Sequence, residues 1–192
     1  MVKRLIVGAS GASGAPLTVE LLRQLHTHHP EIETHLVVTR SGEMTLRQET
    51  GMAPEELRSL ASVCHDNAAI GASIASGSFK TMGMVVVPCS MKAVAGIVSG
   101  YSDNLLLRAA DVCLKERRKL VLAARESPLS TVHLRNLYEA SQLGAVILPP
   151  MLAYYHRPQN IEDCTRHTVN RILSQFDLDE GSYQWGGMDE TV

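Results

Sequence analysis

Three glycines spaced three residues apart lie near the start of the chain, in a stretch that could cradle a phosphate. Gly8, Gly11 and Gly14 follow a short apolar run, and Ser10 and Ser13 lie between them. Glycine lets the backbone approach a ligand closely, and the helical pattern that follows would turn its free N–H groups toward the same loop. The stretch therefore predicts a strand, a glycine-rich turn and a helix that together bind a phosphate-bearing ligand.

The absence of known nucleotide-binding motifs around this turn limits the class of ligand that it can bind. Its spacing is G-x-x-G-x-x-G and not G-x-G-x-x-G, and no Lys-Ser or Lys-Thr pair follows, which excludes a P-loop. The next expected strand, 33–39, ends in Thr39 and Arg40, where a dinucleotide site would place an acid for the ribose diol. A hydroxyl suits flavin mononucleotide (FMN), which has no adenosine ribose. A tight turn that binds nothing is the alternative.

Two further turns carry groups that could contact such a ligand. Ser90 and Lys92 lie in P-C-S-M-K after an apolar strand pattern, where a hydroxyl and backbone N–H groups could hold a phosphate or a flavin edge. A serine there is also a common helix N-cap. Arg125 and Glu126 follow the apolar stretch 120–124. An acid beside a cation can stay ionised, or can give up a proton when a phosphate arrives. A solvated salt bridge is the alternative.

Other charged residues are weaker candidates for the same chemistry. Arg108 and Lys115 share a face of an expected long helix with Asp111, a pattern equally typical of a solvated charged stripe. Tyr155, in a proline-flanked turn, and Arg171, in the last expected helix, are good phosphate donors. A rigid turn and an ordinary surface arginine are the alternatives. If the last helix folds back onto the turn, Tyr155 and Arg171 could clamp one phosphate.

Buried-type strands alternate with helical patterns along the chain. We expect strands at 5–7, 33–39, 83–88, 120–124 and 145–148, and helices from Pro16, over 41–50 and 54–60, up to about Ser99, over 102–118 and 130–143, and from Asn160. Met44 and Leu46 would anchor the second helix, and 64–79 is small and polar with a loop-like end. The alternation predicts an α/β parallel sheet with helices on both faces, which binds ligands at the carboxyl ends of its strands. We expect one domain over 1–176 and a tail or arm over 177–192.

Composition excludes several classes of protein. The chain of 192 residues is 45% hydrophobic with a net charge of -2, which fits a domain with a full core and gives no sign of a nucleic-acid partner. No apolar run approaches the ~20 residues that span a bilayer, and no signal peptide is evident. The four cysteines form no C-x-x-C pair, so we expect reduced thiols in a cytoplasmic protein without a disulfide framework or a metal site.

Several motifs in order resemble those of one family. They are G-A-S-G-A-S-G-A-P, P-C-S-M-K, R-A-A-D-V-C-L-K-E-R-R-K-L-V-L, R-E-S-P-L-S, G-A-V-I-L-P-P and Y-Y-H-R-P-Q, and together they resemble the flavin prenyltransferases. These UbiX-type enzymes are often named as a component of phenolic acid decarboxylase. The resemblance runs from Lys3 to about Phe176. It implies a three-layer, flavodoxin-like and Rossmann-like fold.

The resemblance implies a reaction as well. The enzyme would join a dimethylallyl group from dimethylallyl monophosphate to N5 and C6 of reduced FMN, without a metal ion. The prenylated FMN would serve as the cofactor of a UbiD-type decarboxylase. The family forms large homo-oligomers, dodecamers among them, so the resemblance implies a homo-oligomer here.

The resemblance also assigns roles to single residues. It implies that flavin is bound by residues of the turns that follow the strands: Ser10, Gly11, Ala12, Ser13, Thr39, Ser90, Met91, Lys92, Ala93 and Arg125. It implies that the prenyl phosphate is held by Tyr155, Arg171, Arg108 and Lys115, and that catalysis depends on Glu126, Lys115, Ser13 and Glu49. Glu49 and Arg108 would act across subunits. Thr39 stands where the family often has Ser, and Ala93 where Thr is common, so flavin affinity could be weaker.

Two other functions compete with this one. The nearest rival is a flavin-dependent cysteine decarboxylase of the related fold. That group resembles P-A-S-A-N-T at the second loop, whereas this chain has P-C-S-M-K. The other is a non-catalytic flavin carrier or decarboxylase component, which would return its flavin unmodified.

Overall fold

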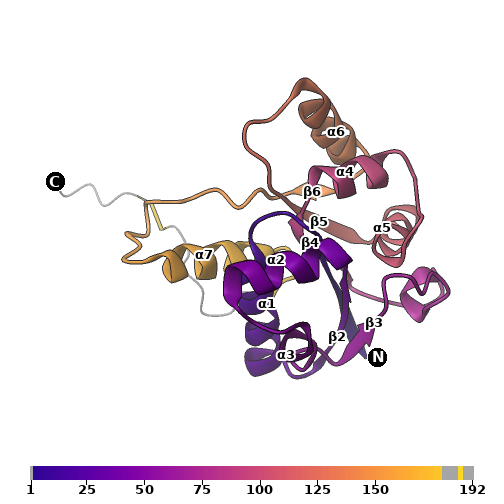
Figure 1. Cartoon of the computed structure of the whole chain (residues 1–192), viewed down its shortest axis with the longest axis horizontal. Helices are drawn as coiled ribbons and strands as arrows, with labels where there is room; N and C mark the ends of the chain where they lie inside the picture. Colours follow the sequence, from indigo (N-terminus) through magenta and orange to yellow (C-terminus); the bar gives the residue numbers. More distant parts are fainter. Residues whose placement is uncertain (1, 179–185, 188–192) are drawn as a thin grey trace.

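One parallel sheet runs through the protein (Figure 1). The structure is a computed structural model and describes residues 2–178 and 186–187. Its sheet has six strands in the order β3-β2-β1-β4-β5-β6, every neighbouring pair parallel. The strands are β1 (Lys3–Ala9), β2 (Ile32–Val38), β3 (Val63–His65), β4 (Gly83–Cys89), β5 (Lys119–Ala124) and β6 (Val146–Ile147). The chain builds outward from β1 to β3 and then continues at β4 on the other side of β1. A switch in strand order, where such sheets bind ligands, therefore lies between β1 and β4.

Helices cover both faces of this sheet. One face carries α1 (Ala15–His28), α2 (Arg40–Thr50), α3 (Pro54–Arg58) and α7 (Ile161–Ser174), and the other carries α4 (Met91–Val98), α5 (Leu105–Lys115) and α6 (Thr131–Gln142). A short 3₁₀ turn, η1 (Ser73–Ala75), lies against α5. The predicted α/β fold with helices on both faces is confirmed. No helix within residues 2–178 is long and apolar enough to cross a membrane.

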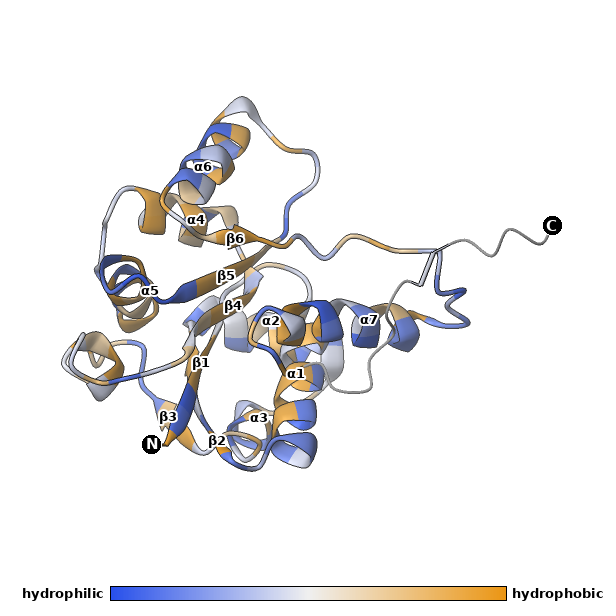
Figure 2. Cartoon of the chain, turned by 180° about the vertical axis from the view of Figure 1, so that it is seen from behind, coloured by the Kyte–Doolittle hydropathy of each residue, from blue (hydrophilic) through white to orange (hydrophobic). Residues whose placement is uncertain are grey.

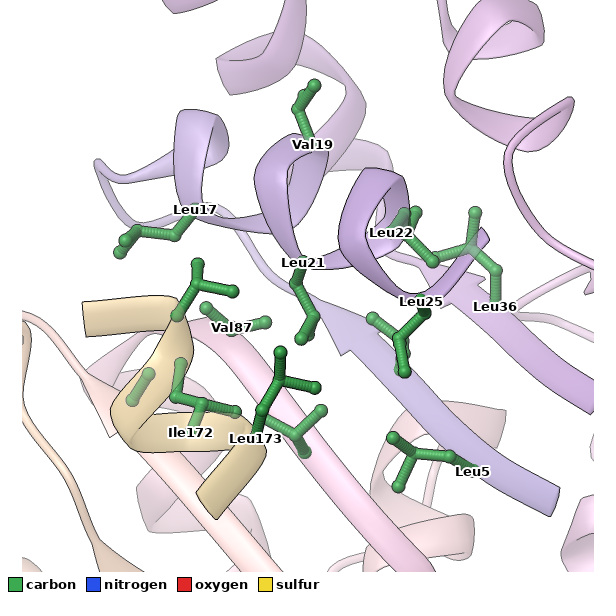
Figure 3. Close-up of a cluster of buried hydrophobic side chains, with 14 of the residues drawn as sticks. Leu5, Leu17, Val19, Leu21, Leu22, Leu25, Leu36, Val87, Ile172 and Leu173 are labelled. Carbon is green, nitrogen blue, oxygen red and sulfur yellow. The ribbon is translucent and has the colours of Figure 1, made fainter. Parts of the chain in front are cut away.

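Two separate apolar clusters hold the layers together. Leu5 points into one cluster and Ile6 into the other, because successive strand residues face opposite sides of a sheet. In the first cluster, Leu21 of α1 and Leu173 of α7 lie close to Val87 of β4 (Figure 3). The strands are hydrophobic along most of their length (Figure 2), as expected for a sheet that is buried on both faces. This core fixes the carboxyl ends of the strands, from which the functional loops leave.

One local expectation is wrong. Met44 does not anchor α2, since its side chain is 62% exposed. The buried residues of that helix are Gly42 and Leu46, which share a face at a spacing of four, and Met44 lies between them on the solvent side. The stretch 64–79 begins with the end of β3, which pairs with β2. This strand is too short to show an apolar run.

The fifth helix and the end of the chain differ in extent from the prediction. We expected a helix over 102–118, but α5 starts after Asn104, whose side chain caps it, and ends at Lys115. Most of the predicted tail lies outside the described residues. Of its described part, Leu178 is 6% exposed and belongs to the first apolar cluster. The packed body therefore reaches at least to that residue.

Candidate functional site

A buried serine ties the first loop to the second. Ser10 is 3% exposed, donates its hydroxyl proton to the carbonyl oxygen of Pro88 over 3.0 Å, and accepts the backbone N–H of Ser90 at 2.7 Å. The side chain therefore links the ends of β1 and β4 across the switch in strand order. We predicted that Ser10 binds flavin. The structure shows its hydroxyl proton already bonded within the protein, so its structural contribution is to hold the two loops in register.

Two glycines let the first loop lie against the start of α2. A Cβ atom on Gly11 would come within 2.5 Å of the Cβ of Ser41, and one on Gly42 within 2.8 Å of the carbonyl oxygen of Ala9. Thr39 caps the helix, since its Oγ1 accepts the N–H of Gly42 at 3.0 Å. The close approach brings the positive end of the α2 dipole to the carboxyl end of β1, where it favours an anion.

A hollow of about 210 Å³ opens where these loops meet. It is lined by residues from the ends of β1, β2 and β4 and from the start of α5: Ser10, Thr39, Arg40, Ser41, Asn67, Ser90, Lys92, Ala93, Asn104, Leu106 and Leu107. Hydroxyl groups and a guanidinium come from the start of α2, and apolar side chains come from α5. The hollow can therefore take a ligand with an anionic part and a flat apolar part, such as FMN.

Sequence reasoning found about half of this lining. Of the predicted flavin residues, Ser10, Thr39, Ser90, Lys92 and Ala93 line the hollow. The others are placed differently: Gly11 lies against Ser41, Ala12 is 8% exposed, and Met91 packs in the second apolar cluster. We missed the contribution of α5 and of Asn67, because these residues are far from the glycine-rich turn in sequence and follow no motif.

Ser90 serves two purposes. Its Oγ accepts the backbone N–H of Ala93 at 3.3 Å, so it is the N-cap of α4, the alternative that the sequence left open. It also lines the hollow together with Lys92, which is exposed on the first turn of α4. The second loop therefore combines the start of a helix with a hydroxyl and with an ammonium group that pairs with no carboxylate of residues 2–178, a set of donors suited to an anionic or carbonyl-rich ligand.

A carboxylate occupies the start of α1. One oxygen of Glu49, Oε2, accepts the backbone N–H groups of Gly14 and Ala15 at 2.9 and 2.8 Å. Partial burial would raise the pKa of Glu49, but hydrogen bonds from the Ser13 side chain and from these two N–H groups, with the charge of Arg125, bring it below its usual value. The structure thus gathers Ser13, Glu49 and Arg125, three predicted site residues from different elements. At neutral pH Glu49 is an anion beside a cation.

Glu126 lies next to this group, at the carboxyl end of β5. Its side chain is exposed, and its Oε1 accepts the backbone N–H of Ser127 at 3.0 Å. The predicted alternative, a salt bridge between Arg125 and Glu126, does not occur among the ion pairs of the described residues. Glu126 is therefore accessible to a ligand, while Arg125 faces Glu49.

Tyr155 and Arg171 lie on either side of a histidine. The hydroxyl of Tyr155 is 2.9 Å from Nε2 of His167, and the ring of His167 stacks on that of His156 with centroids 4.3 Å apart. Burial, followed by the charges of His156 and Arg171, lowers the pKa of His167. Arg171 lies one helical turn further along α7, where its guanidinium donates to Oγ of Ser174. The fold-back of α7 that the clamp required is therefore present.

Arg108 and Lys115 lie away from the hollow. Arg108 bonds to Asp111 and to the carbonyl oxygen of Ala75, and Nζ of Lys115 is 2.6 Å from the carboxylate of Glu116. Lys115 follows Leu107, which lines the hollow, by eight residues, which places it ~12 Å along α5 from that residue. The predicted roles of both residues toward the prenyl phosphate stay predictions.

Comparison with known proteins identifies the family. A family model described as Flavoprotein matches residues 2–175. The flavin prenyltransferase UbiX of Escherichia coli (strain K12) is 55% identical over 175 residues, which are 91% of this chain and 92% of that protein. The chain belongs to the flavin prenyltransferase family. A probable UbiX-like flavin prenyltransferase of Streptomyces sp. (strain D7) is 51% identical over 186 residues, 96% of this chain and 92% of that protein.

Solved structures agree with this assignment. AnUbiX (PadA1), in complex with FMN and dimethylallyl pyrophosphate, has a TM-score of 0.94 at 46% identity and covers 98% of this chain and 100% of its own. A dodecameric FMN-dependent UbiX-like decarboxylase from Escherichia coli O157:H7 gives 0.93 at 48%, over 96% and 100%. The FMN-dependent cysteine decarboxylase SpaF shares the fold alone, with a TM-score of 0.62 at 17% identity over 77% of this chain and 83% of its own.

Proposed function

We propose that this flavin prenyltransferase transfers the dimethylallyl group of dimethylallyl monophosphate to N5 and C6 of reduced FMN. The observation that carries the proposal is the hollow at the β1–β4 switch, with the Ser13, Glu49 and Arg125 group beside it. The family membership supports the same reaction, as does the complex of AnUbiX with FMN and a dimethylallyl donor. The prenylated flavin is then the cofactor of a UbiD-type decarboxylase.

The residues of the hollow fit FMN. Thr39 and Ser41, with the N–H groups at the start of α2, hold the phosphate, and Arg40 balances its charge. Leu106 and Leu107 receive the isoalloxazine ring. The bound reduced flavin supplies the nucleophilic ring atoms. Since no acid follows β2, the site favours the mononucleotide over the dinucleotide.

The donor phosphate is held outside the hollow. We assign Tyr155 and Arg171 to it, because the Tyr155 hydroxyl bonds to His167 and the Arg171 charge acts on the same histidine. Lys115 and Arg108 add positive charge that stabilises the departing phosphate. Lys115 lies on the face covered by α5, and Arg171 on the face covered by α7, so the two reach one phosphate only if they come from different chains. The active enzyme is therefore a homo-oligomer.

Glu126 and Glu49 have different roles in proton transfer. Glu126 is exposed beside Arg125 and exchanges a proton with the phosphate as it leaves. Glu49 has a lowered pKa and is ionised at neutral pH, so it receives a proton and does not donate one. Ser13 bonds to Glu49 and fixes the direction of its carboxylate.

One incubation tests the proposed function. The purified protein is mixed anaerobically with reduced FMN and dimethylallyl monophosphate, and the mass of the released flavin is measured by mass spectrometry. We expect a flavin heavier by one dimethylallyl group. Release of unmodified flavin would indicate a flavin carrier. Decarboxylation of a peptide that ends in cysteine, without prenyl transfer, would indicate a cysteine decarboxylase. Activation of a UbiD-type apo-decarboxylase by the released flavin tests whether that enzyme is the recipient.

A further inference from the structure

Two asparagines line the hollow at the start of α5, and their side chains are bonded differently. Oδ1 of Asn104 accepts the N–H of Leu107 at 3.1 Å, and its Nδ2 donates to Asp103 at 2.8 Å. Oδ1 of Asn67 accepts the N–H of Leu106 at 3.0 Å. No acceptor for Nδ2 of Asn67 occurs among the residues that the structure describes. Both amides cap the helix, but one N–H of Asn104 donates to Asp103, whereas no bond within the described residues uses either N–H of Asn67.

The position of Asn67 within the hollow indicates which part of the ligand it meets. The end formed by the start of α2 is polar and cationic, and the end formed by Leu106 and Leu107 is apolar. Asn67 is bonded to the backbone of Leu106, and its own carbonyl oxygen accepts the N–H of Leu105 at 2.8 Å. It is therefore held at the apolar end, where the flat ring of a flavin fits and its phosphate does not.

Capping does not require an amide here. An aspartate would accept the same N–H and would add a favourable charge at a helix N-terminus. Asparagine differs from aspartate in offering two N–H groups. We infer that Nδ2 of Asn67 donates a hydrogen bond to an acceptor atom of the isoalloxazine ring, so that Asn67 is a flavin-binding residue outside the first and second loops. The inference rests on the proposed FMN site.

The choice of variants separates this role from capping and from charge. Asn67→Asp keeps the cap and loses the donor. Asn160→Asp adds the same charge at the cap of α7, where the Asn160 side chain accepts the N–H of Asp163 and does not line the hollow. Asn67→Ala is neutral and loses both the donor and the cap. FMN affinity is measured by titration, and the unfolding temperature of the flavin-free protein is measured beside it.

We expect Asn67→Ala to bind FMN about 3- to 10-fold more weakly, and Asn67→Asp at least as weakly with its unfolding temperature preserved. Asn160→Asp should stay within about twofold of wild type. Asn67→Ala should weaken the binding of riboflavin, which lacks the phosphate, by the same factor as the binding of FMN. Ser41→Ala should weaken the binding of FMN but not that of riboflavin.

The inference is overturned if Asn67→Ala lowers the unfolding temperature and leaves FMN affinity unchanged, or if the two aspartate variants weaken FMN equally. A loss for FMN without a loss for riboflavin would also overturn the assignment to the ring. Absence of FMN binding by the wild-type protein would instead overturn the proposed function, so the two failures are distinguishable.

Discussion

The flavin end and the prenyl-phosphate end of the site are built in different ways. In the proposed site the flavin end lies within one chain, because the ends of β1, β2 and β4 meet at the carboxyl edge of the sheet. Ser10 joins β1 to β4, and the N–H of Thr39 donates to the carbonyl oxygen of Ala9 at 2.9 Å. The residues assigned to the phosphate are spread over both faces of the sheet. A rigid pocket in one chain can hold the flavin acceptor, whereas the prenyl donor can be enclosed where copies of the chain meet.

The segment before α7 supports this difference. Residues 149–160 run away from the sheet in both overall views (Figures 1 and 2). Within this segment, Met151 and Tyr154 are each 73% exposed and Leu152 is 60% exposed. Several exposed apolar side chains close together are typical of a surface that contacts another protein. A second copy of the chain is the partner that the proposed function requires.

The largest effect is expected from the group that moves a proton. Glu126→Gln should slow prenyl transfer by about 100- to 10,000-fold, because an amide cannot titrate, and should leave FMN affinity unchanged. Single-turnover rates across pH measure the effect, with the exposed Glu139→Gln on α6 as a control. Rates equal to wild type at every pH would remove Glu126 from the mechanism.

A smaller effect separates the phosphate end from the flavin end. A charge-assisted hydrogen bond contributes roughly 1.5–3 kcal/mol, so Arg171→Ala should weaken the prenyl donor about 10- to 150-fold with little change for FMN. Arg171→Lys should recover only part, since lysine lacks the guanidinium fork. Arg166→Ala, on the same helix but paired with Asp163, is the control. Loss of FMN with retention of the donor, or no change in either, would make Arg171 an ordinary surface residue.

A substitution in the first loop should instead weaken binding at the flavin end of the site. Gly11→Ala would place a methyl group 2.5 Å from Ser41, and the start of α2 would have to move. Overpacking costs about 1–3 kcal/mol, so we expect FMN affinity to fall at least about fivefold. Gly71→Ala meets no atom within 4 Å and should bind FMN normally. Equal affinities of the two variants would show that the close approach is not needed.

The smallest effect concerns stability. Because the folded protein lowers the pKa of Glu49 below its usual value, the ionised carboxylate stabilises the fold above that value, and the contribution is lost as the pH falls through the folded pKa. Glu49→Gln should therefore be less stable at pH 7 by about 0.3–1 kcal/mol, and the difference should vanish in acid. Urea unfolding at several pH values measures it. A stability difference that does not change with pH would show that the titration of Glu49 does not contribute.

The turns were predictable because they are local. The glycine spacing predicted a backbone that approaches a ligand closely, and the structure shows a close approach of Gly11 to Ser41. Ser90, predicted as a cap or a ligand contact, caps α4 and lines the hollow. The contribution of Asn67 was not predictable, because 64–79 shows no periodicity and only the folded chain brings it to α5. The separation of Lys115 from the hollow likewise depends on the direction of α5, which its charge pattern does not reveal.

The central claim, that the phosphate end forms between chains, is tested most directly by mixing two impaired variants. Lys115→Ala and Arg171→Ala are co-expressed, and prenyl transfer by the mixed oligomers, at a donor concentration too low to saturate either variant, is compared with that of each variant alone. If the two side chains of one site come from different chains, about one site in four regains both, and activity returns without new mutations. Mixed oligomers as impaired as either parent would contradict the claim.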